Sequence, residues 1–363
     1  TRDYEYVFVD GEAYVYDVGR GQRLVQTISL PGITSIRGVG MDLRDRLLYI
    51  SYGGDGGSDG TGSLAAYDPV AGRIVWNVAY PHGVDSFAIA SDGARIYLPE
   101  GERAPGGRWW VIDAANGSTL GSITAGVGPH NTVVGISGSR VYLGPRNTPY
   151  LYVASTRTDR VIRRLGPLYS GVRPFTINGR ETLAYTTATG LLGFQASSIA
   201  TGRVLYTEAF GGRFRWDPAT WPLTAPSHGI SLSPDDRHLF VIDTPNAYVH
   251  VFDVSGLPRH APRQIANVRL SHSFAGQQAQ CSQDCERDGW LQSSLNGCYV
   301  YVGDSGDVIS ATTYRRVGYL PALRNSRETV EIDWRGDVPV ATSTKSGLGY
   351  ATGRSRPPRP RCR

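Results

Sequence analysis

GISLSPDDRHLFVIDTPNAYVHVFD, residues 229–253, contains three short apolar runs separated by polar turns. The runs cover residues 230–232, 238–241 and 249–253, which is the length of a strand and too short for a stable helix. The SPDD segment at 233–236 is typical of a tight turn, because Pro and Asp both favour turn geometry. The stretch therefore predicts three successive antiparallel strands.

The middle run of this stretch recurs along the chain. Seven occurrences, most with an aromatic centre, lie at residues 47–50, 95–98, 140–143, 183–186, 238–241, 299–302 and 339–342. The first six centres are 43 to 61 residues apart. One four-stranded propeller blade takes ~40–50 residues, so the longer intervals mark insertions. We therefore predict an all-β fold, a seven-bladed β-propeller of four-stranded antiparallel blades.

The two ends of the chain carry the pieces of the last blade. The runs at 330–333 and 338–341 match the first two strands of a blade, and the N-terminal run at 13–17 matches the third. The sequence thus predicts a ring closed by pairing of N- and C-terminal strands, with residues 5–9 or 13–17 paired against 338–342. Closure of this kind removes sheet edges that would otherwise pair with other chains.

The SPDD turn at 233–236, the HLFV run at 238–241 and the YVYV run at 299–302 resemble the repeat of the YVTN or YncE-like propeller family. The likeness extends over residues 1 to about 352 and implies the propeller fold. That family includes binding proteins and proteins of unknown role, so the resemblance implies no single function. More distantly, the layout is similar to that of propeller polysaccharide lyases.

A single propeller domain is expected over residues 1–353, followed by an Arg- and Pro-rich tail at 354–363. The tail holds five arginines, which equal the formal net charge of +5, so the body is about neutral. Without a basic stripe the chain lacks the charge pattern that nucleic acid requires. No apolar run approaches the ~20 residues of a membrane span. We expect the tail to be disordered and to add little to the core, unless Cys362 is bridged to the body.

Four cysteines, at positions 281, 285, 298 and 362, allow three disulfide pairings. Cys281 and Cys285 flank a short polar loop, which favours a local disulfide between them. Free thiols and a zinc site are the alternatives, although no second His or Cys pair follows at zinc-finger distance. Disulfides persist in oxidising compartments, so we expect a secreted, periplasmic or cell-surface protein, with Thr1 beginning a mature form.

Residues just before the innermost strand of each blade converge at one end of a propeller's channel. At this register the sequence places the five residues that we predict to be catalytic: His82, His130, His228, Arg37 and Arg173. Asp288 occupies the equivalent position in the next blade, and Glu331 lies near that of the last blade. Imidazole exchanges protons near neutral pH and guanidinium binds carboxylates, so this set indicates an anionic ligand or proton transfer. The alternative for each histidine is a turn cap bonded to a backbone carbonyl.

The connections between second and third strands are expected to form the rim of the same mouth. The predicted substrate-binding residues are Glu100, Arg146 and Asn147 from these connections, with Asp288, Trp216 and Trp221. The two tryptophans belong to the irregular stretch 211–222, and long irregular loops are often functional. The alternative is that they pack this stretch onto the propeller.

No cofactor is certain from the sequence. A divalent cation is kept open, with Asp55 and Asp59 as oxygen ligands in a loop that lacks the EF-hand pattern. A flexible, solvated loop is the interpretation that we favour for these residues. Serine-hydrolase, P-loop and zincin motifs are absent from the sequence.

The leading hypothesis is a lyase that acts on a uronate-containing glycan, in which arginines neutralise the carboxylate and histidines supply a base and an acid. One alternative is a non-catalytic extracellular propeller that binds glycan or protein. Another is a metal-binding or redox propeller that uses the histidines. The sequence predicts neither the exact substrate nor an oligomeric state.

Overall fold

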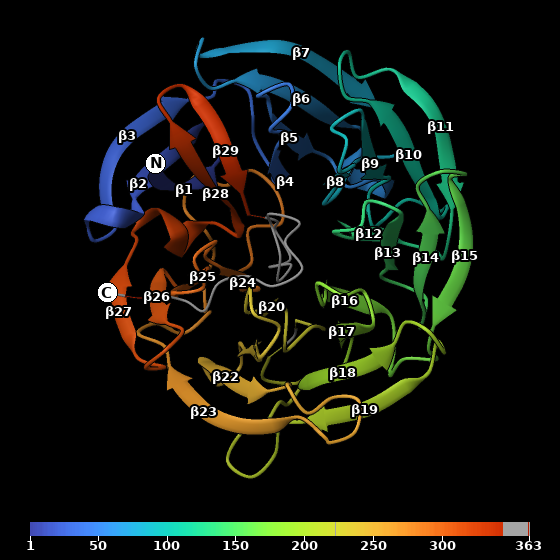
Figure 1. The fold of residues 1–363 in the computed structure, drawn as a ribbon, viewed down its shortest axis with the longest axis vertical. Helices are drawn as coiled ribbons and strands as arrows, with labels where there is room; N and C mark the ends of the chain where they lie inside the picture. The colour runs from blue at the N-terminus through green and yellow to red at the C-terminus, as the bar shows by residue number, and fades with distance from the viewer. Residues whose placement is uncertain (222, 344–361, 363) are drawn as a thin grey trace.

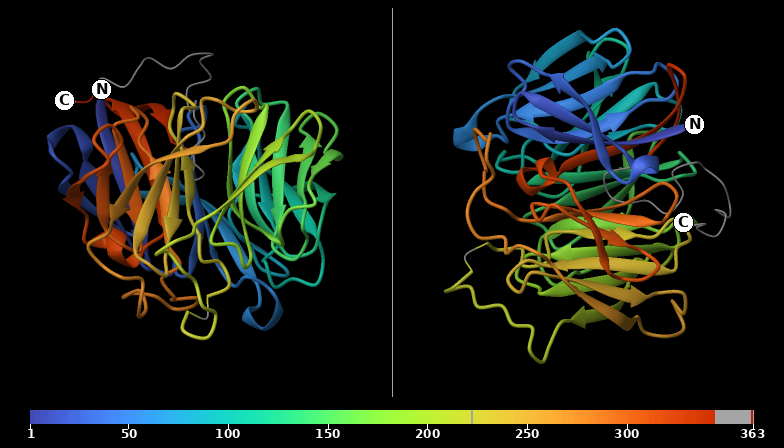
Figure 2. Two further views of the ribbon diagram at one scale, coloured as in Figure 1. Left: turned by 90° about the horizontal axis from the view of Figure 1, so that it is seen from below. Right: turned by 90° about the vertical axis from the view of Figure 1, so that its left-hand side faces the viewer.

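The computed structural model describes residues 1–343 except residue 222, together with residue 362. Seven antiparallel sheets stand as blades around a central channel (Figure 1). Seen from the side, the strands of each blade run between the two faces of a thick disc (Figure 2). The predicted all-β, seven-bladed propeller is confirmed.

Six blades are built from four consecutive strands. In each blade the first strand lines the channel and the fourth forms the outer wall. Blade 1 holds β4 (Ile36–Met41), β5 (Leu48–Gly53), β6 (Gly62–Asp68) and β7 (Arg73–Tyr80). Blade 2 holds β8 (Ala88–Ile89), β9 (Arg95–Pro99), β10 (Arg108–Asp113) and β11 (Thr119–Thr124), and blade 3 holds β12 (Pro129–Val134), β13 (Arg140–Pro145), β14 (Leu151–Ser155) and β15 (Arg160–Leu165).

Blades 4 to 6 repeat this order. Blade 4 holds β16 (Val172–Ile177), β17 (Leu183–Ala188), β18 (Gly193–Ser198) and β19 (Val204–Ala209). Blade 5 holds β20 (Ile230–Leu232), β21 (His238–Asp243), β22 (Tyr248–Asp253) and β23 (Arg263–Arg269), and blade 6 holds β24 (Trp290–Ser293), β25 (Tyr299–Gly303), β26 (Asp307–Ser310) and β27 (Arg316–Tyr319). The short 3-10 helices are η1 (Val18–Arg20), η2 (Gly57–Asp59) and η3 (Ala322–Asn325). Within the described residues, no helix is long and apolar enough to cross a membrane.

Blade 7 joins the two ends of the chain, as predicted, but its strands pair in a different order. Its order is β29 (Val338–Thr342), β28 (Glu328–Arg335), β1 (Arg2–Val9), β2 (Glu12–Asp17) and β3 (Arg23–Ser29). The prediction that residues 5–9 or 13–17 pair with 338–342 is wrong, because β1 pairs with β28 instead. A two-residue turn folds β29 back on β28, so β29 takes the edge of β28 that β1 leaves free.

The apolar core is divided among the interfaces between neighbouring blades. Seven buried clusters account for it, one for each interface. The aromatic centres of the repeated run lie inside them and are at most 1% exposed: Tyr49, Tyr97, Tyr142, Tyr185, Phe240 and Tyr301. The repeat that identifies the fold in the sequence is therefore the same feature that packs each blade against the next.

Two disulfides cross-link the chain. Cys281 bonds to Cys285, which confirms the predicted local disulfide, and Cys298 bonds to Cys362. The second bond meets the condition stated for the tail, because it ties Cys362 to the start of blade 6's second strand. Residues 354–361 and 363, for which disorder is predicted, lie outside the described residues.

Candidate functional site

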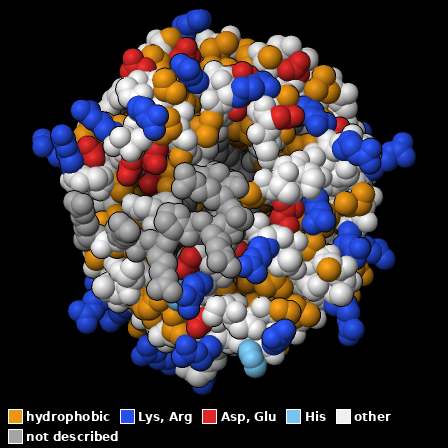
Figure 3. Space-filling view, viewed as in Figure 1, with side chains coloured by type: hydrophobic (Ala, Val, Ile, Leu, Met, Phe, Trp, Pro, Cys, Tyr) orange, Lys and Arg blue, Asp and Glu red, His pale blue; other side chains and the backbone are white. Residues whose placement is uncertain are grey.

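A cavity of about 280 Å³ lies at the end of the channel where the innermost strands begin. Six of the eleven predicted site residues line it: Arg37, His130, Arg173, His228, Asp288 and Arg146. They come from blades 1, 3, 4, 5 and 6 and are up to 251 positions apart in the chain. Figure 3 shows the opposite face of the disc, on the side of the N-terminus, with basic side chains spread around its periphery.

Irregular pairing at the start of three innermost strands positions three of these side chains. The register shifts between Ile36 and Gly38, between Pro129 and Asn131, and between Val172 and Phe175. Arg37, His130 and Arg173 are the residues inside these shifts. A bulged residue leaves the regular ladder and its side chain is re-aimed, which explains how strand residues point into the cavity.

A hydrogen bond to an acidic side chain orients the ring of His130. Its Nδ1 atom lies 2.7 Å from Oδ2 of Asp85 and 3.5 Å from Oε2 of Glu102. The ring is 8% exposed, and its Nε2 atom has no hydrogen-bond partner among the described residues. Carboxylates only accept hydrogen bonds, so Nδ1 carries a proton and Nε2 is left for a ligand.

His228 lies opposite His130, with the two ring centroids 6.3 Å apart. The Nδ1 atom of His228 donates a hydrogen bond to the carbonyl of Gly289 at 3.1 Å. Burial, and then the positive charge of nearby arginines, holds the pKa of His228 well below its usual value. His228 is therefore a neutral imidazole at neutral pH, with the lone pair on Nε2.

Among the described residues, Arg173 has only a distant ion-pair partner, Glu102. Its guanidinium donates to the hydroxyls of Thr189 and Thr224 at 3.0 and 2.7 Å, and the Oε2 atom of Glu102 is 3.9 Å away. Burial, reinforced by the charge of Arg146, lowers the pKa of Arg173 to about 9. An anion bound in the cavity would relieve this electrostatic cost.

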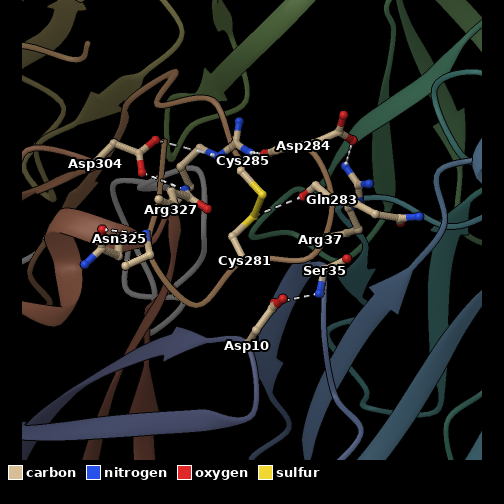
Figure 4. Close-up of a disulfide and its surroundings, with 12 residues drawn as sticks. Asp10, Ser35, Arg37, Cys281, Gln283, Asp284, Cys285, Asp304, Asn325 and Arg327 are labelled. Atoms are coloured by element: carbon tan, nitrogen blue, oxygen red, sulfur yellow. Dashed lines mark hydrogen bonds and ion pairs between the residues drawn. A yellow bond between two sulfur atoms is a disulfide. The ribbon is translucent and has the colours of Figure 1, made fainter. Parts of the chain in front are cut away.

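The loop that carries the first disulfide lies over the cavity. Asp284 belongs to this loop and lies between Cys281 and Cys285. Its carboxylate points to Arg37 and forms an ion pair with it at 2.7 Å (Figure 4). Arg103 binds the other oxygen of Asp284 at 3.0 Å, and Arg327 donates to the Asp284 carbonyl at 3.1 Å. Blades 1, 2 and 7 therefore hold a loop that belongs to blade 6.

Asp55 and Asp59, which the sequence left open as cation ligands, form a cluster with Asp284. Arg103 lies between all three carboxylates, at 3.3 Å from Asp55, 2.5 Å from Asp59 and 3.0 Å from Asp284. The guanidinium group thus occupies the place that a cation would take. Burial raises the pKa of Asp55 to about 7, so this cluster carries less negative charge than three free carboxylates.

Three predicted residues lie outside the cavity lining. His82 is exposed, and burial raises the pKa of the nearby Glu100 carboxyl. Glu100 itself is 3% exposed and paired with Arg108 at 3.3 Å. Asn147 is exposed beside Gly128, although its neighbour Arg146 lines the cavity.

The predicted tryptophans also lie outside the lining. Trp216 donates its indole N–H to the carbonyl of Trp221 at 3.2 Å, and Trp221 packs against the cluster between blades 5 and 6. In the same stretch Phe214 contacts the ring of Tyr248, with centroids 5.1 Å apart. These aromatics pack the stretch onto blade 5, the alternative that the sequence left open.

Sequence reasoning missed the acidic partners Asp85 and Glu102 and the base Arg327. Asp85 stands three residues after His82. The pairing of β8 begins only at Ala88, so that Asp85, and not His82, lines the cavity. Arg327 forms an ion pair with Asp288 at 3.0 Å. The acidic segment 100–103 was a usable signal, because it stands at the rim register predicted from the repeat.

Three of the lining residues place possible metal-ligand atoms close together. Asp85, Glu102 and His130 each place one ligand atom within 4.8 Å of the others. Two carboxylates and an imidazole suit a divalent transition metal. However, Arg146 also contacts Glu102, so a metal would compete there with a guanidinium group.

No family model matches the chain, and no curated protein matches it in sequence. The fold is shared with many solved structures. One is hydrazine synthase from Kuenenia stuttgartiensis, which is 14% identical, with a TM-score of 0.57 and an alignment over 77% of this chain and 78% of that chain. Similarity at this level of identity shows the seven-bladed fold alone. The family-level resemblance to YVTN propellers has no match that confirms it.

Proposed function

We propose that the cavity binds a ligand with one carboxylate and several hydroxyl groups, about the size of one sugar ring, and transfers protons on it. Five arginines and seven carboxylates line the cavity. Such a mixed lining suits hydroxyl groups, which both donate and accept, better than a highly charged anion. The volume of about 280 Å³ is near the lower end for small-molecule pockets.

The pair of imidazoles carries this proposal. His130 and His228 stand on blades 3 and 5, each with Nδ1 bonded to the protein, so that each keeps Nε2 for the ligand. Arg173, which is 5% exposed and short of counter-charge, lies on the blade between them. Two proton-transfer groups beside a carboxylate-binding cation are what β-elimination from a uronate unit needs.

In that reaction His228, which is neutral, takes the proton from the carbon next to the carboxylate. The electron pair forms a carbon–carbon double bond, the bond to the leaving sugar oxygen breaks, and that oxygen receives a proton from His130. The carboxylates of Asp85 and Glu102 beside Nδ1 stabilise the protonated ring of His130 that this step requires. Arg173 neutralises the substrate carboxylate as negative charge develops.

The test is turnover of polygalacturonate, alginate and rhamnose–glucuronate oligosaccharides, followed by the absorbance of the unsaturated product. We expect His130→Gln and His228→Gln to lower the rate by about 10²–10⁴-fold. His82→Ala is the matched control, because His82 shares their sequence register but lies outside the cavity, and it should keep the full rate. Binding of an acidic oligosaccharide without any absorbance change would replace the lyase by a non-catalytic binding propeller. No binding at all would overturn the proposal.

A metal-dependent function is the second candidate, favoured by the grouping of Asp85, Glu102 and His130. Elemental analysis of the purified protein and of Glu102→Gln would decide it. Both candidate functions fit an oxidising compartment, because disulfides persist there. One disulfide closes the loop over the cavity, and the other joins Cys362 to blade 6.

A further inference from the structure

The interface between blades 6 and 7 differs from the other six. In each of those, the apolar cluster includes or contacts a residue from an innermost strand, or from the turn entering it. The cluster between blades 6 and 7 draws only on β1, β2, β25, β26 and the segment 320–323, with no residue of β24 or β28. Polar side chains fill the inner part of this interface instead.

Two of these side chains are glutamates that face each other. Glu5 on β1 and Glu331 on β28 are paired in the sheet register, and they are 0% and 1% exposed. Asp3 and Asp333 form the next pair of the same face, two residues further along both strands. No arginine, lysine or histidine of the described residues forms an ion pair with any of the four. Asp3 and Asp333 are half-buried, and the positive N-terminus acts on Asp333. Glu5 and Glu331 are buried without such a charge among the described residues, which is costly, so this pair calls for a cation or for protons.

Unpartnered oxygens surround the glutamate pair. Oε1 of Glu331 and Oε1 of Gln292 have no hydrogen bond to a described residue, although both residues are 1% exposed. The hydroxyl of Thr329 donates to the carboxylate of Glu5. Gln292 reaches across from β24, and its amide nitrogen lies 3.5 Å from Oε1 of Glu5. An amide oxygen and a hydroxyl beside two carboxylates make a ligand set of oxygen only.

A directly shared proton does not account for this arrangement. The second oxygen of Glu331 accepts from the backbone N–H of Leu295 at 2.7 Å, and no hydrogen bond joins the two carboxyl groups of this described pair. Two carboxylates that are paired in the register and almost fully buried carry an electrostatic penalty, because each repels the other. A cation between the two carboxylates would remove this penalty and satisfy the amide oxygen as well.

We propose that Glu5, Glu331, Gln292 and Thr329 bind a hard divalent cation of the calcium class between blades 6 and 7. Calcium takes six to eight oxygen ligands and prefers carboxylate, carbonyl and water oxygens, so water would complete the shell. The site is separate from the cavity, whose lining on these strands ends at Phe8 and Glu328, about three residues (~10 Å) away. The ion joins the N-terminal strand, the C-terminal strand and blade 6, and therefore stabilises ring closure.

The experiment measures the melting temperature of the chain, stripped with EDTA, as calcium chloride is added. At a hundredfold excess over Kd we expect a rise of roughly 3–5 °C for the wild type. The rise should vanish in the double variant Glu5→Gln, Glu331→Gln, and calorimetric titration should show one calcium fewer bound. Thr329→Val should weaken calcium binding with less change to the fold.

Glu181→Gln is the matched control. Glu181 is also a buried blade glutamate, but the backbone N–H of Ser137 and the hydroxyl of Tyr142 satisfy its carboxylate at 2.8 and 3.0 Å. This variant should keep the calcium response, as should Glu102→Gln, which removes the metal candidate in the cavity. If the double variant does not fold, the calcium content of the dialysed wild type decides the question. No calcium response in the wild type between pH 6 and 9, or an equal response in the double variant, would overturn the proposal.

Discussion

Nδ1 of His130 lies 2.7 Å from Oδ2 of Asp85, although the two residues belong to neighbouring blades and are 45 positions apart. The other carboxylate oxygen accepts from the backbone N–H of Ser86 at 2.7 Å, which holds the acid in place. The bond fixes the side of the imidazole that faces the protein. It therefore also fixes the atom that faces the cavity.

The first prediction concerns this tautomer. In the wild type, the ¹⁵N chemical shifts of the neutral His130 ring should show the proton on Nδ1 and the lone pair on Nε2. Asp85→Asn should mix the tautomers, because an amide donates as well as accepts, and should lower turnover within the ~10²–10⁴-fold range of general acid–base catalysis. A wild-type ring protonated at Nε2 alone would contradict the assignment.

The second prediction is that His228 stays neutral as the pH falls. Its pKa is held well below 6.5 by burial, so its NMR signals should not titrate between pH 8 and 6. The unfolded chain takes up a proton there and the folded chain does not, so His228 costs stability as the pH falls below about 6.5. His228→Gln should remove that part of the pH dependence.

The third prediction concerns the disulfide between Cys298 and Cys362. It closes a loop with a sequence separation of 64, whereas Cys281 and Cys285 are only 4 apart. Constraint of the unfolded chain grows with loop length, so Cys298→Ser should lower the free energy of unfolding by about 2–4 kcal/mol. Cys281→Ser should lower it less, and chemical denaturation would measure both.

Removal of residues 354–363 provides the cross-check, because it takes away Cys362 and the bond with it. Truncation and Cys298→Ser should therefore have similar effects, and the two changes together should not add. A truncated chain as stable as the wild type would show that the bond contributes nothing.

The fourth prediction is a loss of stability with rising pH in the presence of chelator. The pKa of Glu5 is raised from 4.5 to about 8, so the folded chain binds a proton that the unfolded chain has lost. Stability is thus retained below about pH 4.5 and falls as the pH rises towards 8. Glu5→Gln should flatten this slope in urea denaturation, whereas Glu181→Gln should leave it unchanged. Equal slopes for the wild type and Glu5→Gln would contradict the assignment to Glu5.

Much of the fold was predictable because the repeat is local. Each run such as 238–241 carries its own strand signal, and its aromatic centre is also the residue that packs against the next blade. The failure at 338–342 has a physical cause. Its alternating residues Val338 and Val340 are 36% and 37% exposed, as in an edge strand. A run of apolar residues in the sequence does not by itself distinguish an edge strand from a buried one.

The candidate site was predictable only as a register. Counting from the repeat places Arg37, His130, Arg173 and His228 at the start of innermost strands, and the structure brings these four into one cavity. The same counting selects His82, whose side chain lies outside. In blade 2 the innermost strand is only two residues long and begins later, at Ala88, so Asp85 takes the place at the cavity.

The amino-acid sequence by itself determined the number of blades, the closure of the ring by both chain ends and the short disulfide, because these depend on apolar periodicity and on residues close in the chain. Tertiary structure alone decided which groups meet: Asp85 with His130, Asp284 with Arg37, and Glu5 with Glu331. These contacts join segments 45 to 326 positions apart. Their formation depends on bulges, strand lengths and the register of the closing blade, which no local pattern of residues encodes.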